Sequence, residues 1–200
     1  MGSERIDRPD AGGGGDPNED QAILDATVAV LRKRGWGGTS FEAVASQAGV
    51  ETAKIERRYP SKVALVADAA TRDRDTNFPS FDTGSATGDL MAFVLGSHRR
   101  LLESVWHLVL PGVLADAAED PAVSEAVQRA WEWRRNAVAA IVGRGVARGE
   151  IHPETDPGHV LDMVDGPTLF RLLVTKAPLD YAFADSLVDG VIRAVGGPWR

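Results

Sequence analysis

Residues 39–62 have the sequence TSFEAVASQAGVETAKIERRYPSK, which predicts two short helices joined by a tight turn. Val44 and Ala45 fall on one face of the first helix, and Ile55 marks the inward face of the second. Gly49 stands between them, where the chain must turn, because glycine adopts positive φ at little steric cost. Two helices of this size joined by a short turn that contains glycine form a helix-turn-helix.

The ends of these two helices carry capping signals. Thr39 and Glu42 have the T-x-x-E spacing of a capping box, in which each side chain binds the unpaired backbone N–H of the other residue. Pro60 ends the second helix, and Ser61 is placed to cap the next one. We therefore expect Thr39 to cap the first helix and a third helix to follow Ser61.

The composition limits the class of protein. The chain has 200 residues, enough for one or two domains with a substantial core. It has long runs of helix-forming residues and few stretches in which β-branched residues alternate with polar ones, so helices are favoured over strands. It has no uninterrupted apolar run of about 18 residues, and no apolar segment follows basic residues at the N-terminus. We therefore expect neither a membrane span nor a signal peptide. The absence of cysteine excludes disulfides and thiolate metal sites and fits a cytoplasmic protein.

The net charge of −7 is unevenly distributed along the chain. Residues 20–65 hold seven Lys/Arg against five Asp/Glu, whereas residues 76–200 hold 11 Lys/Arg against 16 Asp/Glu. Positive charge is therefore concentrated in the helix-turn-helix, and the field at a contact face matters more for phosphate binding than the total charge. The small local excess predicts only modest affinity for nucleic acid of arbitrary sequence.

Glycine, proline and apolar periodicity divide the chain into parts. We expect a disordered arm at residues 1–15, a helix-turn-helix domain at residues 16–76 and a helical domain at residues 77–200. Asp16-Pro17, Asp120-Pro121 and Asp156-Pro157 each predict the start of a helix, with the aspartate as cap, and Pro111 is expected to kink or break another helix. In the last part, five helices are expected at roughly 89–102, 106–118, 121–148, 157–174 and 180–195.

The helix-turn-helix resembles the N-terminal DNA-binding domain of the TetR family of transcriptional regulators. The resemblance rests on A-x-x-A-G-V at residues 45–50, followed by an aromatic-Pro-Ser-Lys run at residues 59–62. It covers residues 18–75 closely, and residues 147–156 resemble a turn common in the C-terminal domains of the family. The resemblance implies an all-α protein of about nine helices. A three-helix DNA-binding domain would precede a helical ligand-binding and dimerisation domain.

The resemblance also implies where DNA would bind, because the family places its second short helix in the major groove. The expected DNA contacts are Thr39, Ser40, Thr52, Ala53, Lys54, Glu56, Arg57, Arg58 and Lys62. Glu56 stands where the family usually has a tyrosine that hydrogen-bonds a phosphate, and Lys54 replaces a small threonine or serine. A carboxylate there either repels phosphate or accepts a hydrogen bond from a cytosine amino group. The alternative interpretation is a solvated, charged helix face.

In this family the second domain binds a small effector between its helices. The effector candidates are His98, Trp106, His107, Trp131, Arg134 and Met163. Arg134 interrupts an apolar stripe, so its guanidinium needs either a carboxylate such as Glu103 or an anionic ligand. The tryptophans also fit a hydrophobic core. His152 and His159, with Asp156 and Asp162 nearby, could suggest a metal site. A helix start broken by proline separates the two histidines and no thiolate is present, so we expect no metal, and we also expect no cofactor.

The last two helices carry apolar residues that we expect to form a homodimer interface, as they do in the family. These residues are Val160, Val164, Leu172, Leu187, Val188, Val191 and Ile192. The hypothesis is therefore a homodimeric regulator, a repressor in this interpretation, that binds a palindromic operator and is released by a small molecule. The alternative is a helical small-molecule-binding dimer that has lost specific DNA binding. We expect no enzyme, because no nucleophile–base pair or phosphate-binding glycine loop stands out.

Overall fold

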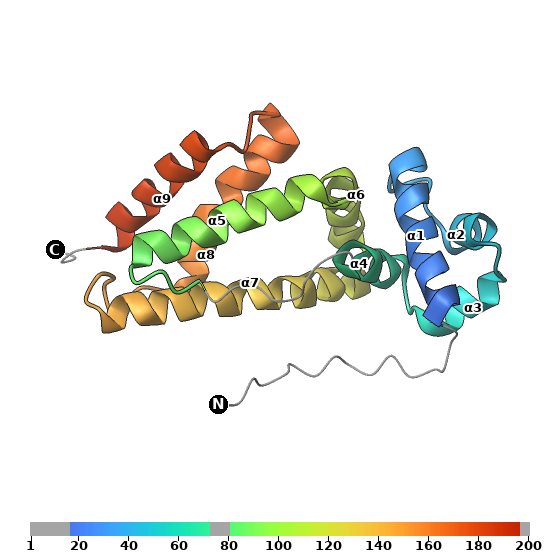
Figure 1. Cartoon of the computed structure of the whole chain (residues 1–200), viewed down its shortest axis with the longest axis horizontal. Coiled ribbons are helices and arrows are strands. Elements are labelled where there is room, and N and C mark those ends of the chain that lie inside the picture. Colours follow the sequence, from blue (N-terminus) through green and yellow to red (C-terminus); the bar gives the residue numbers. More distant parts are fainter. Residues whose placement is uncertain (1–16, 73–80, 197–200) are drawn as a thin grey trace. The chain divides into compact units, whose positions relative to one another are not determined.

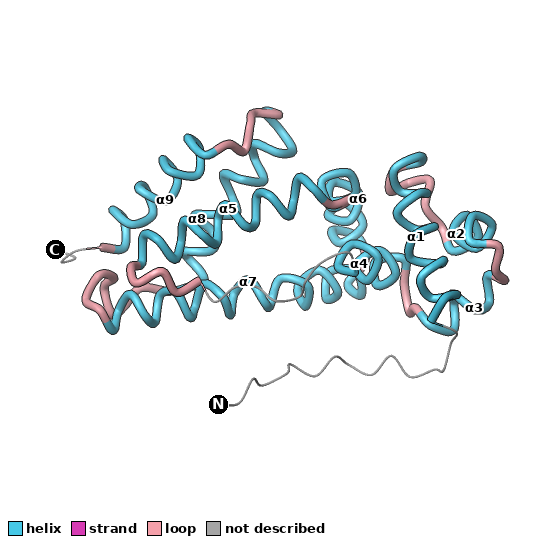
Figure 2. The backbone as a smooth tube through the Cα atoms, viewed as in Figure 1, coloured by secondary structure: helices cyan, strands magenta, loops and turns pink. Residues whose placement is uncertain are grey.

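The computed structural model of the chain describes residues 17–72 and 81–196. Within these ranges the chain forms nine α-helices and one π-helical turn, and it has no strand (Figures 1 and 2), which confirms the predicted all-α class. Contacts divide the chain into two compact units, residues 1–74 and 75–200. The predicted arm at residues 1–15 and the first residues of the predicted linker, 77–80, lie outside the described residues.

The first unit consists of four short helices around a small apolar core. They are α1 (Pro17–Arg34), α2 (Phe41–Ala48), α3 (Thr52–Arg58) and α4 (Lys62–Arg72). Helix α1 packs against α2 and α4, and α2 packs against α3, as in Figure 1. The core contains Ile23, Leu24, Ala26, Val30, Val44, Ala45, Ile55, Tyr59, Leu65 and Ala69. The predicted helix-turn-helix is thus confirmed, with α3 fixed to the core by Ile55, which is fully buried.

The turn between α2 and α3 has the predicted geometry, but the cap before α2 differs. Gly49 has φ 71°, the left-handed conformation that glycine adopts most readily. The predicted capping box at Thr39 is wrong, because Ser40 is the N-cap, and its hydroxyl accepts from the Ala43 N–H at 3.2 Å. Thr39 is buried instead, and its hydroxyl donates to the Gly35 carbonyl at 2.8 Å, at the end of α1. A hydrogen bond with Ser40 lowers the pKa of the Glu42 carboxyl.

The second unit contains the remaining helices. They are α5 (Ala86–Glu103), α6 (Trp106–Glu119), α7 (Pro121–Ala147), α8 (Pro157–Phe170), the π-helical turn η1 (Arg171–Thr175) and α9 (Tyr181–Val195). Helix α5 packs against α7 and α9, α7 packs against α6 and α8, and α8 packs against α9. Asp120 and Asp156 cap α7 and α8 immediately before a proline, as predicted.

Two helix predictions in this unit need correction. Helix α5 begins at Ala86 rather than Asp89, because Ser85 accepts from the Gly88 N–H at 3.1 Å and caps the helix one turn earlier. Asp89 is fully buried and pairs with Arg144 of α7 at 3.2 Å and with Arg148, the C-cap of α7, at 3.3 Å. The predicted break at Pro111 does not occur, because α6 continues through it from Trp106 to Glu119.

The core of the second unit is formed mainly by α5, α7, α8 and α9. Its buried residues include Leu90, Phe93, Val94, Val138, Ile141, Val142, Val160, Leu161, Val164, Ala184, Val188, Val191 and Val195. In the described part of the chain, no single helix has the length and apolarity needed to cross a membrane. Only α5 and α6 together meet these criteria, as a pair bent by 91°.

Candidate nucleic-acid interface and ligand domain

The exposed side of α3 is the candidate nucleic-acid interface. Ala53, Glu56 and Arg57 are exposed, whereas Ile55 faces the core. Thr52 is half-buried at the first position of the helix. This arrangement arises because Ile55 is the apolar residue of α3 that joins the core beside α2, so the residues next to it point outward.

The two other cations predicted on α3 are paired with the first turn of α1. The Lys54 ammonium lies 2.7 Å from a Glu19 carboxylate oxygen. The Arg58 guanidinium pairs with Asp20, and this hydrogen bond raises the pKa of Arg58. The Lys54 pair is the more open of the two, with side chains 41% and 30% exposed, against 27% and 20% for the Arg58 pair.

The residues that flank α2 and α4 take other positions. Thr39 is buried with its hydroxyl bonded to Gly35, whereas Ser40 is exposed while its hydroxyl caps α2. The Lys62 ammonium lies 3.9 Å from the centroid of the Trp36 ring, a cation–π contact, and donates to the Trp36 carbonyl at 3.4 Å. Lys62 is thereby held beside the end of α1.

Tyr59 fixes the end of α3 to α4. Its ring is buried in the core, and its hydroxyl donates to Asp68 of α4 at 2.7 Å. Burial, together with the bond to Asp68, raises the pKa of the Tyr59 phenol. The aromatic residue of the aromatic-Pro-Ser-Lys run is therefore a structural residue that orients α3.

In the second unit, Arg134 of α7 has an internal partner. Its Nε donates to Asp165 of α8 at 2.9 Å, a second guanidinium nitrogen binds the other oxygen of that carboxylate, and Nη1 donates to Ser97 at 3.0 Å. Trp131 Nε1 also donates to Asp165, at 3.3 Å. Of the two alternatives for Arg134, the structure has the protein carboxylate, but it is Asp165 and not the suggested Glu103, because Asp165 lies on the helix packed against α7.

His98 of α5 lies next to this cluster and holds a single tautomer. The Thr168 hydroxyl donates to the Val164 carbonyl at 2.8 Å, so it must accept from His98 Nε2, which lies 3.0 Å away. His98 Nδ1 is therefore an acceptor, and it is buried with no hydrogen-bond partner among the described residues. Burial first, and then the charge of Arg134, lower the pKa of His98, while Asp165 opposes them.

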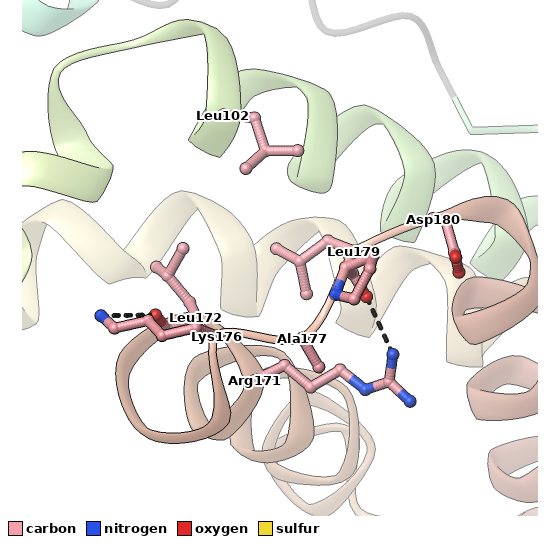
Figure 3. A pocket seen from close by; sticks show the side chains of 8 residues that line it. Leu102, Arg171, Leu172, Lys176, Ala177, Leu179 and Asp180 are labelled. Atoms are coloured by element: carbon pink, nitrogen blue, oxygen red, sulfur yellow. Dashed lines mark hydrogen bonds between the residues drawn. The ribbon is translucent and has the colours of Figure 1, made fainter.

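A hollow of about 470 Å³ opens beside the π-helical turn (Figure 3). Its lining is Leu102, Arg171, Leu172, Lys176, Ala177, Pro178, Leu179 and Asp180, and we call it the Leu102 hollow. Arg171 donates to the Pro178 carbonyl at 2.8 Å and Lys176 to the Leu172 carbonyl at 3.1 Å, as the dashed lines in Figure 3 mark. The hollow thus combines apolar side chains with two cations, Arg171 and Lys176, and one acid, Asp180.

The Leu102 hollow adjoins His98. Leu102 lies one turn beyond His98 on α5, and Leu172 lies one turn beyond Thr168 on the chain that continues α8. Phe183 of α9 stacks on the His98 ring with centroids 5.6 Å apart. The guanidinium of Arg171 lies 3.9 Å from the Phe183 ring centroid. A chain of contacts therefore connects the hollow to the buried histidine.

The other effector candidates are more scattered. Met163 is half-buried and packs against the core of the second unit. Trp106 and His107 begin α6, where both are half-buried and His107 Nδ1 has no hydrogen-bond partner among the described residues. The structure therefore brings together Trp131 and Arg134, places His98 beside them, and leaves the α6 residues on another helix.

The predicted dimer residues do not form one exposed surface. Val160, Val164, Val188 and Val191 lie in the core of the second unit. These four valines, which we expect at a dimer interface from the sequence, are buried within the single chain, because both helices turn their apolar faces toward α5 and α7. Of the same set, Leu172, Leu187 and Ile192 are half-buried.

Several residues of these sites were missed by sequence reasoning. Glu19 and Asp20 stand where acids stabilise the start of a helix, and nothing in the sequence around Asp165 marks it as a partner of an arginine. The contact of Trp36 with Lys62 has no local signal either. Each partnership joins residues that are distant in sequence, so no spacing pattern could identify it.

These features define a class of protein: an N-terminal helix-turn-helix with an outward-facing second helix, followed by a separate helical unit, is the architecture of a helix-turn-helix transcriptional regulator. The chain belongs to the TetR family. Residues 23–69 match the model of bacterial regulatory proteins of the tetR family, and residues 81–191 match the tetracyclin repressor-like C-terminal domain.

Relatives and solved structures agree with this assignment. The DNA-binding transcriptional repressor TetR of Mycobacteroides abscessus is 30% identical over 179 residues, which cover 88% of this chain and 93% of that protein. The HTH-type transcriptional repressor KstR of Mycobacterium tuberculosis is 26% identical, and the match covers 76% of this chain and 68% of that protein. The crystal structure of the TetR family transcription regulator SCO0332 has a TM-score of 0.68 at 27% identity and covers 90% of this chain and 100% of that one. The chain is accordingly a helix-turn-helix transcriptional regulator, in a family of regulators and not of enzymes.

Proposed function

We propose that two copies of the chain bind a palindromic operator through α3, act as a repressor, and release DNA when a small molecule binds the second unit. The observation that carries the proposal is the exposed face of α3. Ala53, Glu56 and Arg57 lie on this face, outside the core, while Ile55 is buried and holds the helix in place. A relative that matches 88% of this chain is named a DNA-binding transcriptional repressor, which supports repression. We place this activity in the cytoplasm.

Recognition would follow from placing α3 in the major groove. Arg57 is suited to guanine or to phosphate, and the Ala53 methyl can pack on a thymine methyl. Glu56 is suited to the amino group of cytosine. Ser40 stands at the N-terminus of α2, where backbone N–H groups can face a phosphate.

Dimerisation would use the outer face of α9 instead of the buried valines. Ala182, Ser186, Gly190 and Ala194 are exposed and repeat every four residues, so they form one narrow stripe on the helix. Small side chains let two helices approach closely. A two-fold pair would hold two copies of α3 about one DNA turn apart, roughly 34–36 Å or a multiple of it.

Gly190 offers a clean test of this interface. A Cβ atom added at Gly190 meets nothing within 4 Å, so Gly190→Leu leaves the fold of the single chain unstrained while it enlarges the stripe. Gly143→Leu on α7 is the matched control, because that glycine is also exposed and also has open space. Sedimentation should give a dimer for the wild type and the control and a weaker dimer for Gly190→Leu. A wild-type monomer at micromolar concentration contradicts the proposal.

The effector would occupy the Leu102 hollow and extend toward His98. The apolar lining suits a hydrophobic body, Arg171 and Lys176 suit a negative group, and His98 Nδ1 requires a hydrogen-bond donor. Arg134 does not demand an anion, because Asp165 already neutralises it. Such a ligand can release DNA only if it binds the DNA-competent and incompetent conformations with different affinity.

Selection of duplexes from a random-sequence pool tests the whole function. The wild type should enrich a sequence with two-fold symmetry, and a library of amphipathic acids should contain members that both change tryptophan fluorescence and displace that duplex. Ligand binding without enrichment of any duplex would contradict DNA recognition and favour the alternative of a dimer that binds only small molecules. Enrichment without any displacing compound would contradict effector control.

A further inference from the structure

Two acids of α1 neutralise two cations of the recognition helix. Lys54 and Arg58 are four residues apart, so they lie on the same face of α3, and each is held by one of two adjacent residues, Glu19 and Asp20. We propose that these acids are specificity-determining residues: they occupy the cations of α3 and thereby suppress binding to DNA of arbitrary sequence. The inference rests on the proposed binding of DNA through α3.

Glu19 and Asp20 lie at a position that favours the charged form of a carboxylate. Both lie in the first turn of α1, at the positive end of its helix dipole, which favours negative charge. Arg58 also lies 5.8 Å from the Tyr59 ring centroid, so its guanidinium is held by both an acid and an aromatic ring. The pairs are therefore built into the packing of α1 on the helix-turn-helix.

The charge balance gives the pairs a consequence for DNA binding. Helix α3 carries three cations, Lys54, Arg57 and Arg58, against the single acid Glu56. When Glu19 and Asp20 are included, the positive and negative charges are equal. Binding to arbitrary DNA is driven by cations that neutralise phosphates and release counterions. A helix face without net charge gains little free energy from counterion release, so contacts to base edges decide which duplex binds.

The same geometry predicts how DNA engages the cations. A phosphate must displace a carboxylate before it can bind Lys54 or Arg58, and the more exposed Lys54 pair opens first. Phosphates of a duplex whose bases fit α3 are held in register and can complete this exchange. Phosphates of a poorly fitting duplex are not held there, so the carboxylates keep the cations.

Asp20→Asn tests the proposal, with Asp25→Asn as the matched control. Both changes remove one carboxylate from α1, but Asp25 is exposed and bonds only to Gln21 among the hydrogen bonds of the described residues. Affinity is measured for a random-sequence duplex and for the duplex that the wild type selects, over a range of salt concentrations. Asp20→Asn should bind the random duplex several-fold more tightly and steepen the salt dependence by about 0.9 per subunit, the slope for one further phosphate contact. Asp25→Asn should change both quantities less.

A second variant shows whether the gain passes through Arg58. In Asp20→Asn combined with Arg58→Gln, the cation that the first change releases is missing, so the gain on random DNA should disappear. Urea unfolding of each variant reports its fold separately from its DNA affinity. Equal behaviour of Asp20→Asn and Asp25→Asn, or a gain that persists without Arg58, overturns the role of the acids. Failure of the wild type to select any duplex overturns the proposed function as well.

Discussion

The ion pair between Arg134 and Asp165 leads to a quantitative prediction for Asp165→Asn. Both side chains are largely buried, with 14% and 16% exposed, and the carboxylate binds the guanidinium through both oxygens. Removing one partner of a buried pair costs about 3–5 kcal/mol, because the other charge stays buried without compensation. Ser97 still accepts a hydrogen bond from Arg134, and the asparagine amide keeps one acceptor oxygen. We therefore expect a loss near the lower end, about 3 kcal/mol.

The assay is thermal unfolding followed by tryptophan fluorescence, since Trp131 donates to the same carboxylate. At about 2–4 °C for each kcal/mol in a protein of this length, Asp165→Asn should lower the Tm by roughly 6–12 °C. Glu125→Gln is the control, because its pair with Arg129 on α7 is exposed, with side chains 70% and 64% accessible. It should cost less than about 0.5 kcal/mol. Equal losses in the two variants would refute the buried pair.

Three further predictions concern other residues. Ser40→Ala should lower the free energy of unfolding by about 1 kcal/mol in urea titrations, because it removes the N-cap of α2, and a neutral result would contradict the assigned cap. The pKa of His98 is below its ordinary 6.5, so the unfolded chain takes up a proton that the folded chain does not. Stability should therefore fall as the pH falls below about 6.5, and urea unfolding of His98→Gln should lose less between about pH 7.5 and 5.5 than the wild type. Glu56→Tyr should tighten binding to arbitrary duplexes by about 1 kcal/mol per subunit, since it removes a charge that repels phosphate. In binding titrations it should weaken the selected duplex by about 1–3 kcal/mol per half-site if Glu56 accepts from cytosine, and no change on either duplex would contradict the placement of α3.

Local signals were sufficient to predict the fold. Gly49 specified the turn, Ile55 specified the buried face of α3, and Asp-Pro pairs specified the starts of α7 and α8. The cap of α2 was placed one residue too early because Thr39 and Ser40 both carry hydroxyls. The end of α1, which comes close in the folded chain, decides which hydroxyl caps the helix.

The candidate sites were harder to predict than the fold, because they depend on contacts between residues that are distant in sequence. The exposed face of α3 followed from its periodicity, but the pairing of Lys54 with Glu19 requires α1 to pack across the helix-turn-helix. In the same way, a buried arginine could be predicted at position 134, whereas its partner Asp165 lies 31 residues away on another helix. Pattern gives the direction of a side chain, and only the packed structure identifies what it meets.

The central claim is that a dimer recognises a symmetric duplex through α3. The most direct measurement titrates the duplex selected by the wild type, and a scrambled duplex of the same composition, while sedimentation counts the chains bound. The account predicts two chains on each selected duplex, weaker binding to the scrambled one, and affinity that falls with salt for both. Equal affinity for the two duplexes, or one chain per duplex, would contradict it.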